Sequence, residues 1–141
     1  MSAQTLINTL ADTARAAGRT LSTATGAERK AALLTIADAI EARSVEILAA
    51  NAKDMEAGHA AGLNSSLLDR LLLTPERIKG IAGGTRQVSE LPDPLGITLR
   101  KSTLPNGIEL EQISVPFGVI GMVYEARPNV TVDAAVILVM S

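Results

Sequence analysis

VIGMVYEARPNVTVDAAVILVMS, residues 119–141, combines two patterns that decide the fold. Residues 119–124 form a continuous apolar run, which is typical of a strand buried on both faces of a parallel sheet. Residues 130–141 have the character of a helix, and Asn129 stands near its expected N-cap. The stretch therefore predicts a strand, a loop at 125–129 and a helix, the first β-loop-α of a parallel α/β fold.

A β-loop-α segment of this kind needs a second strand, because its helix returns the chain to the sheet. The sequence ends at Ser141, before any such strand. We therefore expect these residues to be a truncated part of a larger α/β fold. The alternative is a C-terminal helix that docks on the helical half of the chain.

The first 90 residues are rich in alanine and leucine, with helical periodicity. They predict one helix around residues 6–17. Thr25 and Glu28 have the spacing of a capping box, in which each side chain satisfies a free backbone amide of the other. The box is expected to open one long amphipathic helix that carries the apolar residues between 33 and 48.

Shorter helical segments follow. Asn51 is expected to cap a turn at 52–57, and a further segment is expected at about 65–72. Thr74 followed by Pro75 then predicts a helix that runs to about Ser89, with threonine at the N-cap and proline at the first helical position.

Two prolines and a glycine in Leu91–Gly96 end the helical part of the chain. Residues 97–102 and 108–115 are expected strands, and the Asn106-Gly107 pair between them is a strong hairpin signal. The sequence therefore divides into three parts: 1–96, 97–115 and 116–141.

Composition excludes several classes of function. The chain has no cysteine, which rules out disulfides and thiolate metal sites, and its acidic residues lack metal-ligand spacing. Its 13 lysines and arginines are scattered and the net charge is −2, so nucleic-acid binding has no support. The longest apolar run, 130–140, is about half of what a bilayer requires. We expect a cytoplasmic protein with no membrane segment and no metal.

Glu125-Ala-Arg-Pro-Asn129 is the best candidate for chemistry. It lies at the carboxyl end of the predicted strand and at the start of the predicted helix, where ligands of open α/β sheets bind. Arg127 suits a carboxylate or a phosphate; the alternative is a surface ion pair with Glu125. Asn129 offers an amide donor for a developing oxyanion; the alternative is an ordinary N-cap.

PFGVIGMVYEARPNVTVDAA, residues 116–135, resembles the segment that opens the cofactor-binding fold of γ-glutamyl phosphate reductase, of the aldehyde dehydrogenase superfamily. The stretches 50–58, 67–96 and 104–116 are similar to the same family. The resemblance implies the N-terminal portion of such an enzyme. Residues 1–96 would be the helical part of its Rossmann-like cofactor domain, 97–115 a β-hairpin oligomerisation arm, and 116–141 the truncated start of the parallel sheet.

The resemblance further implies NADPH-dependent reduction of γ-glutamyl phosphate to glutamate-5-semialdehyde and phosphate, in proline biosynthesis. The family's nucleophile is a cysteine thiolate, so the isolated chain is expected to be inactive. By matching position, Val123, Tyr124 and Glu125 approach the nicotinamide ribose and Asn129 is the oxyanion donor. Arg127 is the candidate for an anionic group of the substrate. A homo-oligomer and functional coupling to glutamate 5-kinase are also implied.

Two other classes of function stay open. The chain is alternatively a non-catalytic oligomerisation or interaction module that pairs through the edges of its hairpin and an exposed helix. It is also read as a fragment that binds an anion or nucleotide weakly at the helix start near Asn129.

Overall fold

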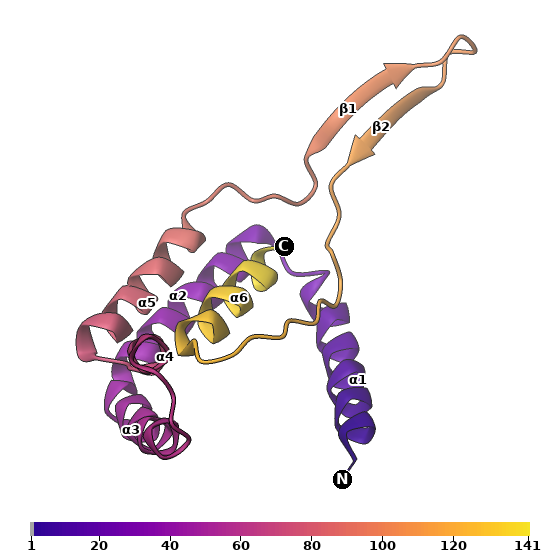
Figure 1. The fold of residues 1–141 in the computed structure, drawn as a ribbon. Coiled ribbons are helices and arrows are strands. Elements are labelled where there is room, and N and C mark those ends of the chain that lie inside the picture. The colour runs from indigo at the N-terminus through magenta and orange to yellow at the C-terminus, as the bar shows by residue number, and fades with distance from the viewer. Residues whose placement is uncertain (1) are drawn as a thin grey trace.

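The computed structural model describes residues 2–141 and is mostly helical, with one two-stranded antiparallel sheet (Figure 1). In chain order its elements are α1 Ala3–Leu21, α2 Gly26–Ala42, α3 Ser44–Ala60, α4 Ser65–Leu71, α5 Pro75–Ser89, β1 Thr98–Thr103, β2 Glu109–Ile113 and α6 Pro128–Met140. No helix within residues 2–141 combines the length and the apolar character that crossing a membrane requires.

Helices α2, α5 and α6 pack together and enclose the core (Figure 1). Leu33 of α2 meets Val136 and Met140 of α6, and all three are buried. Side chains from the same three helices complete this cluster: Ile36, Val88, Val132 and Val139. The apolar helix at the end of the sequence is therefore docked on the helical half of the chain, which removes its side chains from water.

Two of the predicted capping signals, at Thr25 and at Thr74, are confirmed. Thr25 Oγ1 accepts from the backbone N–H of Glu28 at 3.2 Å, and Glu28 Oε2 accepts from the N–H of Thr25 at 2.7 Å. Helix α5 begins at Pro75, and the Thr74 hydroxyl accepts from the N–H of Arg77 at 3.2 Å. Both helix starts form where expected because their signals are local.

Two expectations for the helical half are wrong. The single long helix expected through residues 33–48 is divided at Arg43, whose φ of −100° and ψ of 18° lie outside the helix. Asn51 does not cap a turn, because it lies inside α3 and is buried. Its side chain bonds to the segment after α4: it donates to the Leu71 carbonyl at 2.8 Å and accepts from the N–H of Leu73 at 2.7 Å.

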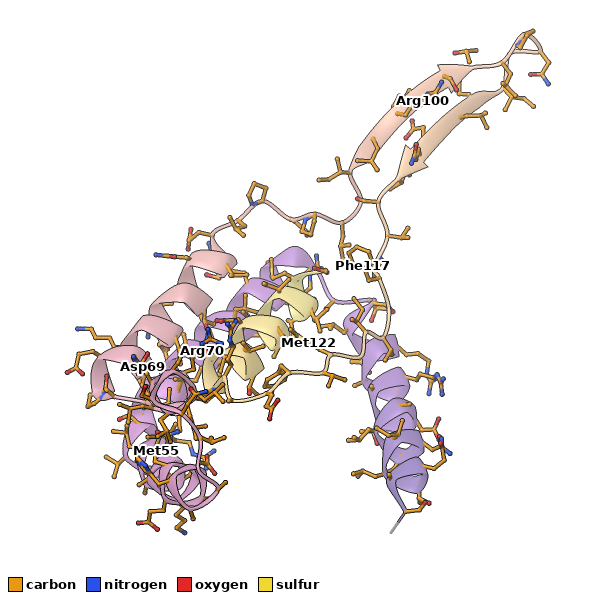
Figure 2. The ribbon with its side chains drawn as sticks, viewed as in Figure 1. Met55, Asp69, Arg70, Arg100, Phe117 and Met122 are labelled. Atoms are coloured by element: carbon orange, nitrogen blue, oxygen red, sulfur yellow. The ribbon has the colours of Figure 1, made fainter. Side chains whose placement is uncertain are left out.

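The predicted hairpin is confirmed. Strands β1 and β2 are antiparallel, Ser102 is paired with Leu110, and Gly107 takes the φ of +85° that its turn requires. The hairpin extends away from the helices (Figure 1), and every residue of both strands is exposed. Figure 2 shows Arg100 on this arm, well apart from Asp69 and Arg70 at the end of α4.

The strand expected at residues 119–124 is not formed. The segment has no assigned strand, and residues 119–126 take part in no backbone–backbone hydrogen bond within the described chain. Its side chains are exposed, and Val123 is 100% exposed. A strand requires a hydrogen-bonded neighbour, and residues 2–141 place none beside it. The parallel Rossmann-like sheet is thus absent from the described residues.

Candidate functional site

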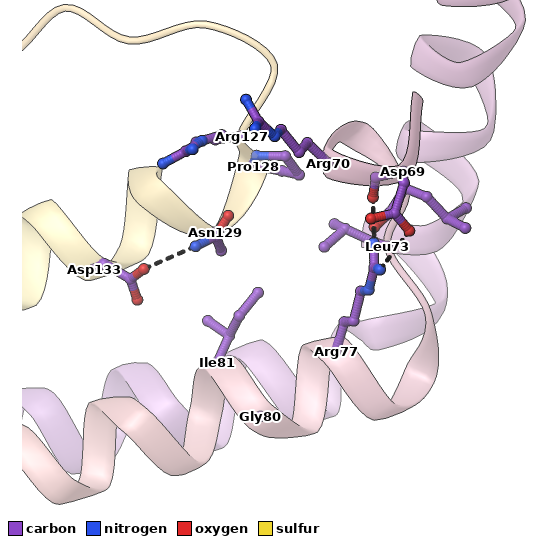
Figure 3. Close-up of a pocket in the computed structure, with 11 residues that line it drawn as sticks. Asp69, Arg70, Leu73, Arg77, Gly80, Ile81, Arg127, Pro128, Asn129 and Asp133 are labelled. Atoms are coloured by element: carbon purple, nitrogen blue, oxygen red, sulfur yellow. Dashed lines mark hydrogen bonds and ion pairs between the residues drawn. The ribbon is translucent and has the colours of Figure 1, made fainter. Parts of the chain in front are cut away.

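An open pocket of about 500 Å³ lies between the end of α4, the start of α5 and the start of α6 (Figure 3). It contains two of the predicted site residues, Arg127 and Asn129. The remaining lining comes from earlier helices and from α6: Asp69, Arg70, Leu72, Leu73, Arg77, Gly80, Ile81, Pro128 and Asp133. Its charged side chains are three arginines and two aspartates.

Arg77 fixes the wall formed by α4 and α5. Its guanidinium donates to Asp69 Oδ1 at 2.8 Å, to the Leu72 carbonyl at 2.8 Å and to the Asp69 carbonyl. The buried Asn51 of α3 also holds this segment, through its hydrogen bonds to the backbone of Leu71 and Leu73. The charges of Arg77 and Asp69 therefore neutralise each other. The connection between α4 and α5 is bonded both to Arg77 and to Asn51.

The opposite wall is the first turn of α6. Ala126 has a φ of +50°, the left-handed region that non-glycine residues rarely adopt, and it turns the chain into the helix. Arg127 occupies the N-cap position and makes no side-chain capping bond. Proline suits the first helical position because it has no N–H to satisfy, so α6 begins at Pro128.

Asn129 is consequently not the N-cap, contrary to the alternative considered for it. It lies within the first turn of α6, and its Nδ2 donates to Asp133 Oδ2 at 3.0 Å (Figure 3). The amide group carries two N–H donors, so this bond leaves one of them for a ligand. The neighbouring carboxylate also places a negative charge beside that donor.

The alternative for Arg127 was an ion pair with Glu125, and the described chain contains no such pair. The side chains of Arg127 and Arg70 have no hydrogen-bond or ion-pair partner among residues 2–141. Figure 3 shows Arg70 extending from α4 toward the side where Arg127 and Pro128 lie. Sequence reasoning missed Arg70 and Asp133, because no local motif marks either of them.

The predicted cofactor residues Val123, Tyr124 and Glu125 do not line this pocket. They lie on the extended segment before it and are exposed. The Tyr124 hydroxyl is 2.6 Å from Thr131 Oγ1, which ties this segment to α6. Their backbone groups make no hydrogen bond to other backbone groups, so they are available to a ligand or to a neighbouring strand. Residues 2–141 contain no cluster of three histidine or acidic side chains suited to a metal.

No protein-family model matches the chain. Curated relatives do. γ-Glutamyl phosphate reductase of Kineococcus radiotolerans is 52% identical over 128 residues, or 91% of this chain and 30% of the relative. The enzyme of that name from Anoxybacillus flavithermus is 60% identical over 108 residues, which are 77% of this chain and 26% of the relative. That of Thermobifida fusca is 47% identical over 135 residues, which are 96% of this chain and 32% of the relative.

The predicted resemblance to γ-glutamyl phosphate reductase is confirmed. Crystal structures of γ-glutamyl phosphate reductase agree with it. That from Thermotoga maritima matches with a TM-score of 0.88 at 35% identity, over 92% of this chain and 31% of the other. That from Saccharomyces cerevisiae matches with a TM-score of 0.87 at 33% identity, over 100% and 35%. The chain thus spans about 30% of the length of the curated relatives it matches.

Proposed function

We propose that this chain is the N-terminal portion of a γ-glutamyl phosphate reductase, which reduces γ-glutamyl phosphate to glutamate-5-semialdehyde and phosphate in proline biosynthesis. The observation that carries the proposal is identity of 47–60% to relatives of that name. Whole-protein activity belongs to a chain about three times as long, by the share of each relative that is matched.

The reaction requires a nucleophile at the acyl carbon and donors for the oxyanion that forms there. The 141 residues contain no cysteine, so the thiolate must come from outside them and the chain alone is inactive. We assign the oxyanion role to the remaining N–H of the Asn129 amide. Asp133, which accepts the other N–H at 3.0 Å, orients that amide and opposes the oxyanion electrostatically. We assign recognition of an anionic substrate group to Arg127.

NADPH, when bound, supplies the hydride for the reduction. Val123, Tyr124 and Glu125 are proposed to contact its nicotinamide ribose through their backbone groups. These residues fit such a contact, because they are exposed and their N–H and C=O groups make no hydrogen bond to other backbone groups. Tyr124 is anchored to α6 through Thr131, which would hold the segment at a constant distance from the pocket.

The division into a helical part at 1–96, a hairpin arm at 97–115 and the start of a sheet at 116–141 stays a prediction. We propose that the arm forms a homo-oligomer, because it exposes apolar residues that include Leu99 and Leu110. Its strand edges are also free to pair with another chain. Functional coupling to glutamate 5-kinase and a cytoplasmic location belong to the same proposal.

The exposed hairpin also favours a second candidate, a non-catalytic interaction module. Every residue of both strands is exposed, and α1 has no buried residue. Such a module would associate at raised concentration without a nucleotide, and it would not support reductase chemistry in any longer protein. Activity of a longer protein therefore separates the two candidates.

A chimaera tests the proposal. This chain replaces the matched segment of the Kineococcus radiotolerans relative, and oxidation of glutamate-5-semialdehyde with NADP⁺ and phosphate is measured. We expect an active enzyme, with kcat lowered about 100-fold by Asn129→Ala and KM raised by Arg127→Gln. A chimaera that folds and assembles like the relative but has no activity contradicts the proposed function. Arg19→Gln, an exposed arginine on α1, is the control.

A further inference from the structure

The unpaired charges of the pocket have a definite pattern. Arg77 and Asp69 neutralise each other at 2.8 Å. Arg70 and Arg127 remain as two positive charges, one from α4 and one from the start of α6. Asp133 remains as one negative charge on α6, engaged only by the neutral Asn129 amide. A ligand that complements all three must carry a negative and a positive group.

We propose that this pocket binds the α-amino-acid end of its ligand, with Arg70 and Arg127 on the α-carboxylate and Asp133 on the α-ammonium. A guanidinium is a fixed fork of donors that matches a carboxylate, and two of them give a strong site. The inference rests on the proposed function, since a γ-glutamyl group has a free α-carboxylate and α-ammonium. It adds Arg70 and Asp133 as specificity-determining residues and states which end of the substrate they hold.

A phosphate group would suit the two arginines as well as a carboxylate does. It would, however, leave the Asp133 carboxylate without a positive partner and would bring further negative charge beside it. The pocket is therefore assigned to the amino-acid end and not to the phosphoryl group. Three probes separate these chemistries: L-glutamate, glutarate, which lacks the ammonium group, and inorganic phosphate.

The test is an NMR titration of the 141-residue chain that follows the Nε–Hε signals of its arginines. We expect L-glutamate to shift the signals of Arg70 and Arg127 together, with one Kd, and to leave Arg100 on the hairpin unchanged. Arg70→Gln should weaken glutamate binding about tenfold, and Arg70→Lys less. Asp133→Asn should weaken glutamate binding and leave glutarate binding unchanged or tighter. Arg19→Gln should leave the Kd unchanged.

The proposal is overturned if either glutarate or phosphate binds with the same Kd as L-glutamate. The absence of any shift of Arg70 and Arg127 at millimolar glutamate also overturns it. The backbone amide spectrum of each variant shows whether it is folded, so a lost site is distinguished from a lost structure. The titration requires no catalysis, so its result is independent of the chimaera assay. If the 141-residue chain binds glutamate as expected but the chimaera is inactive, the proposed function is contradicted and this inference stands.

Discussion

Arg29 Nη2 lies 2.7 Å from both carboxylate oxygens of Asp93. Arg29 is only 4% exposed, and its Nη1 donates to the Ala24 carbonyl at 2.6 Å. The Asp93 side chain is 39% exposed and lies in the linker between α5 and the hairpin. This pair joins the start of α2 to the base of the arm, and it links segments that are far apart in the chain.

Asp93→Ala should lower the free energy of unfolding by about 3 kcal/mol, because it leaves the buried Arg29 guanidinium without its counter-charge. Urea unfolding followed by far-UV circular dichroism measures the change. Asp12→Ala, which removes an exposed pair with Arg15 on α1, is the matched control and should cost less than about 0.5 kcal/mol. An equal loss of unfolding free energy in the two variants would show that burial of Arg29 does not strengthen its pair with Asp93.

Gly26 is required by the same pair. A Cβ at this position would lie 2.3 Å from Asp93 Oδ2, and Arg29 holds that oxygen in place. Gly26→Ala should therefore destabilise the chain by about 1–3 kcal/mol, and most of this cost should vanish when Asp93 is already alanine. Gly83→Ala in α5, where nothing lies within 4 Å, should instead stabilise the chain by about 0.5–1 kcal/mol. A cost at Gly26 that is unchanged in the double variant would contradict the clash.

Asn51→Leu should cost about 2–3 kcal/mol of unfolding free energy, because the Leu71 carbonyl and the Leu73 N–H lose their partner. The unfolding free energy of Asn51→Asp should lie between those of the unchanged chain and Asn51→Leu, since a carboxylate can accept from the Leu73 N–H and cannot donate to the Leu71 carbonyl. Thermal and urea unfolding give both values. Asn8→Ala on the exposed α1 is the control, and a smaller effect at Asn51 than at Asn8 would refute the bridging role.

Stability at acid pH should depend on Glu41. Hydrogen bonds from Arg86 lower the pKa of this carboxyl below its usual 4.5. The unfolded chain therefore binds the proton more readily, so the stabilisation is present above the usual pKa and is lost as pH falls through the lower folded value. Glu41→Gln should flatten the fall of unfolding free energy below about pH 4.5. Gln87→Ala, at an exposed and uncharged site on α5, is the control and should leave the slope unchanged; an equal flattening would contradict the assignment.

Local signals predicted much of this fold. The capping box at Thr25 and Glu28, Thr74 before Pro75, and Asn106-Gly107 each act within a few residues, and the structure forms all three. The break at Arg43 escaped prediction because no glycine or proline marks it. The role of Asn51 also escaped, because its partners lie in a later segment that only the tertiary packing brings near.

The site was predictable in part for the same reason. Arg127 and Asn129 stand out beside an apolar run, and both line the pocket. Arg70 belongs to an ordinary helical segment, so its position opposite Arg127 depends on tertiary contacts: α4 packs on α3, and α6 packs on α5. Placing Asn129 at the N-cap failed because Pro128 is better suited to the first helical position, which moves the helix start forward.

Hydrogen exchange at residues 119–124 shows whether this segment is a strand of a sheet that the rest of a reductase completes. The amides of Val119–Tyr124 are measured in the 141-residue chain and in the chimaera with the Kineococcus radiotolerans relative. We predict rapid exchange in the chain alone, where these amides have no backbone partner, and strong protection in the chimaera. Rapid exchange in both would contradict the assignment of this chain to a larger parallel sheet.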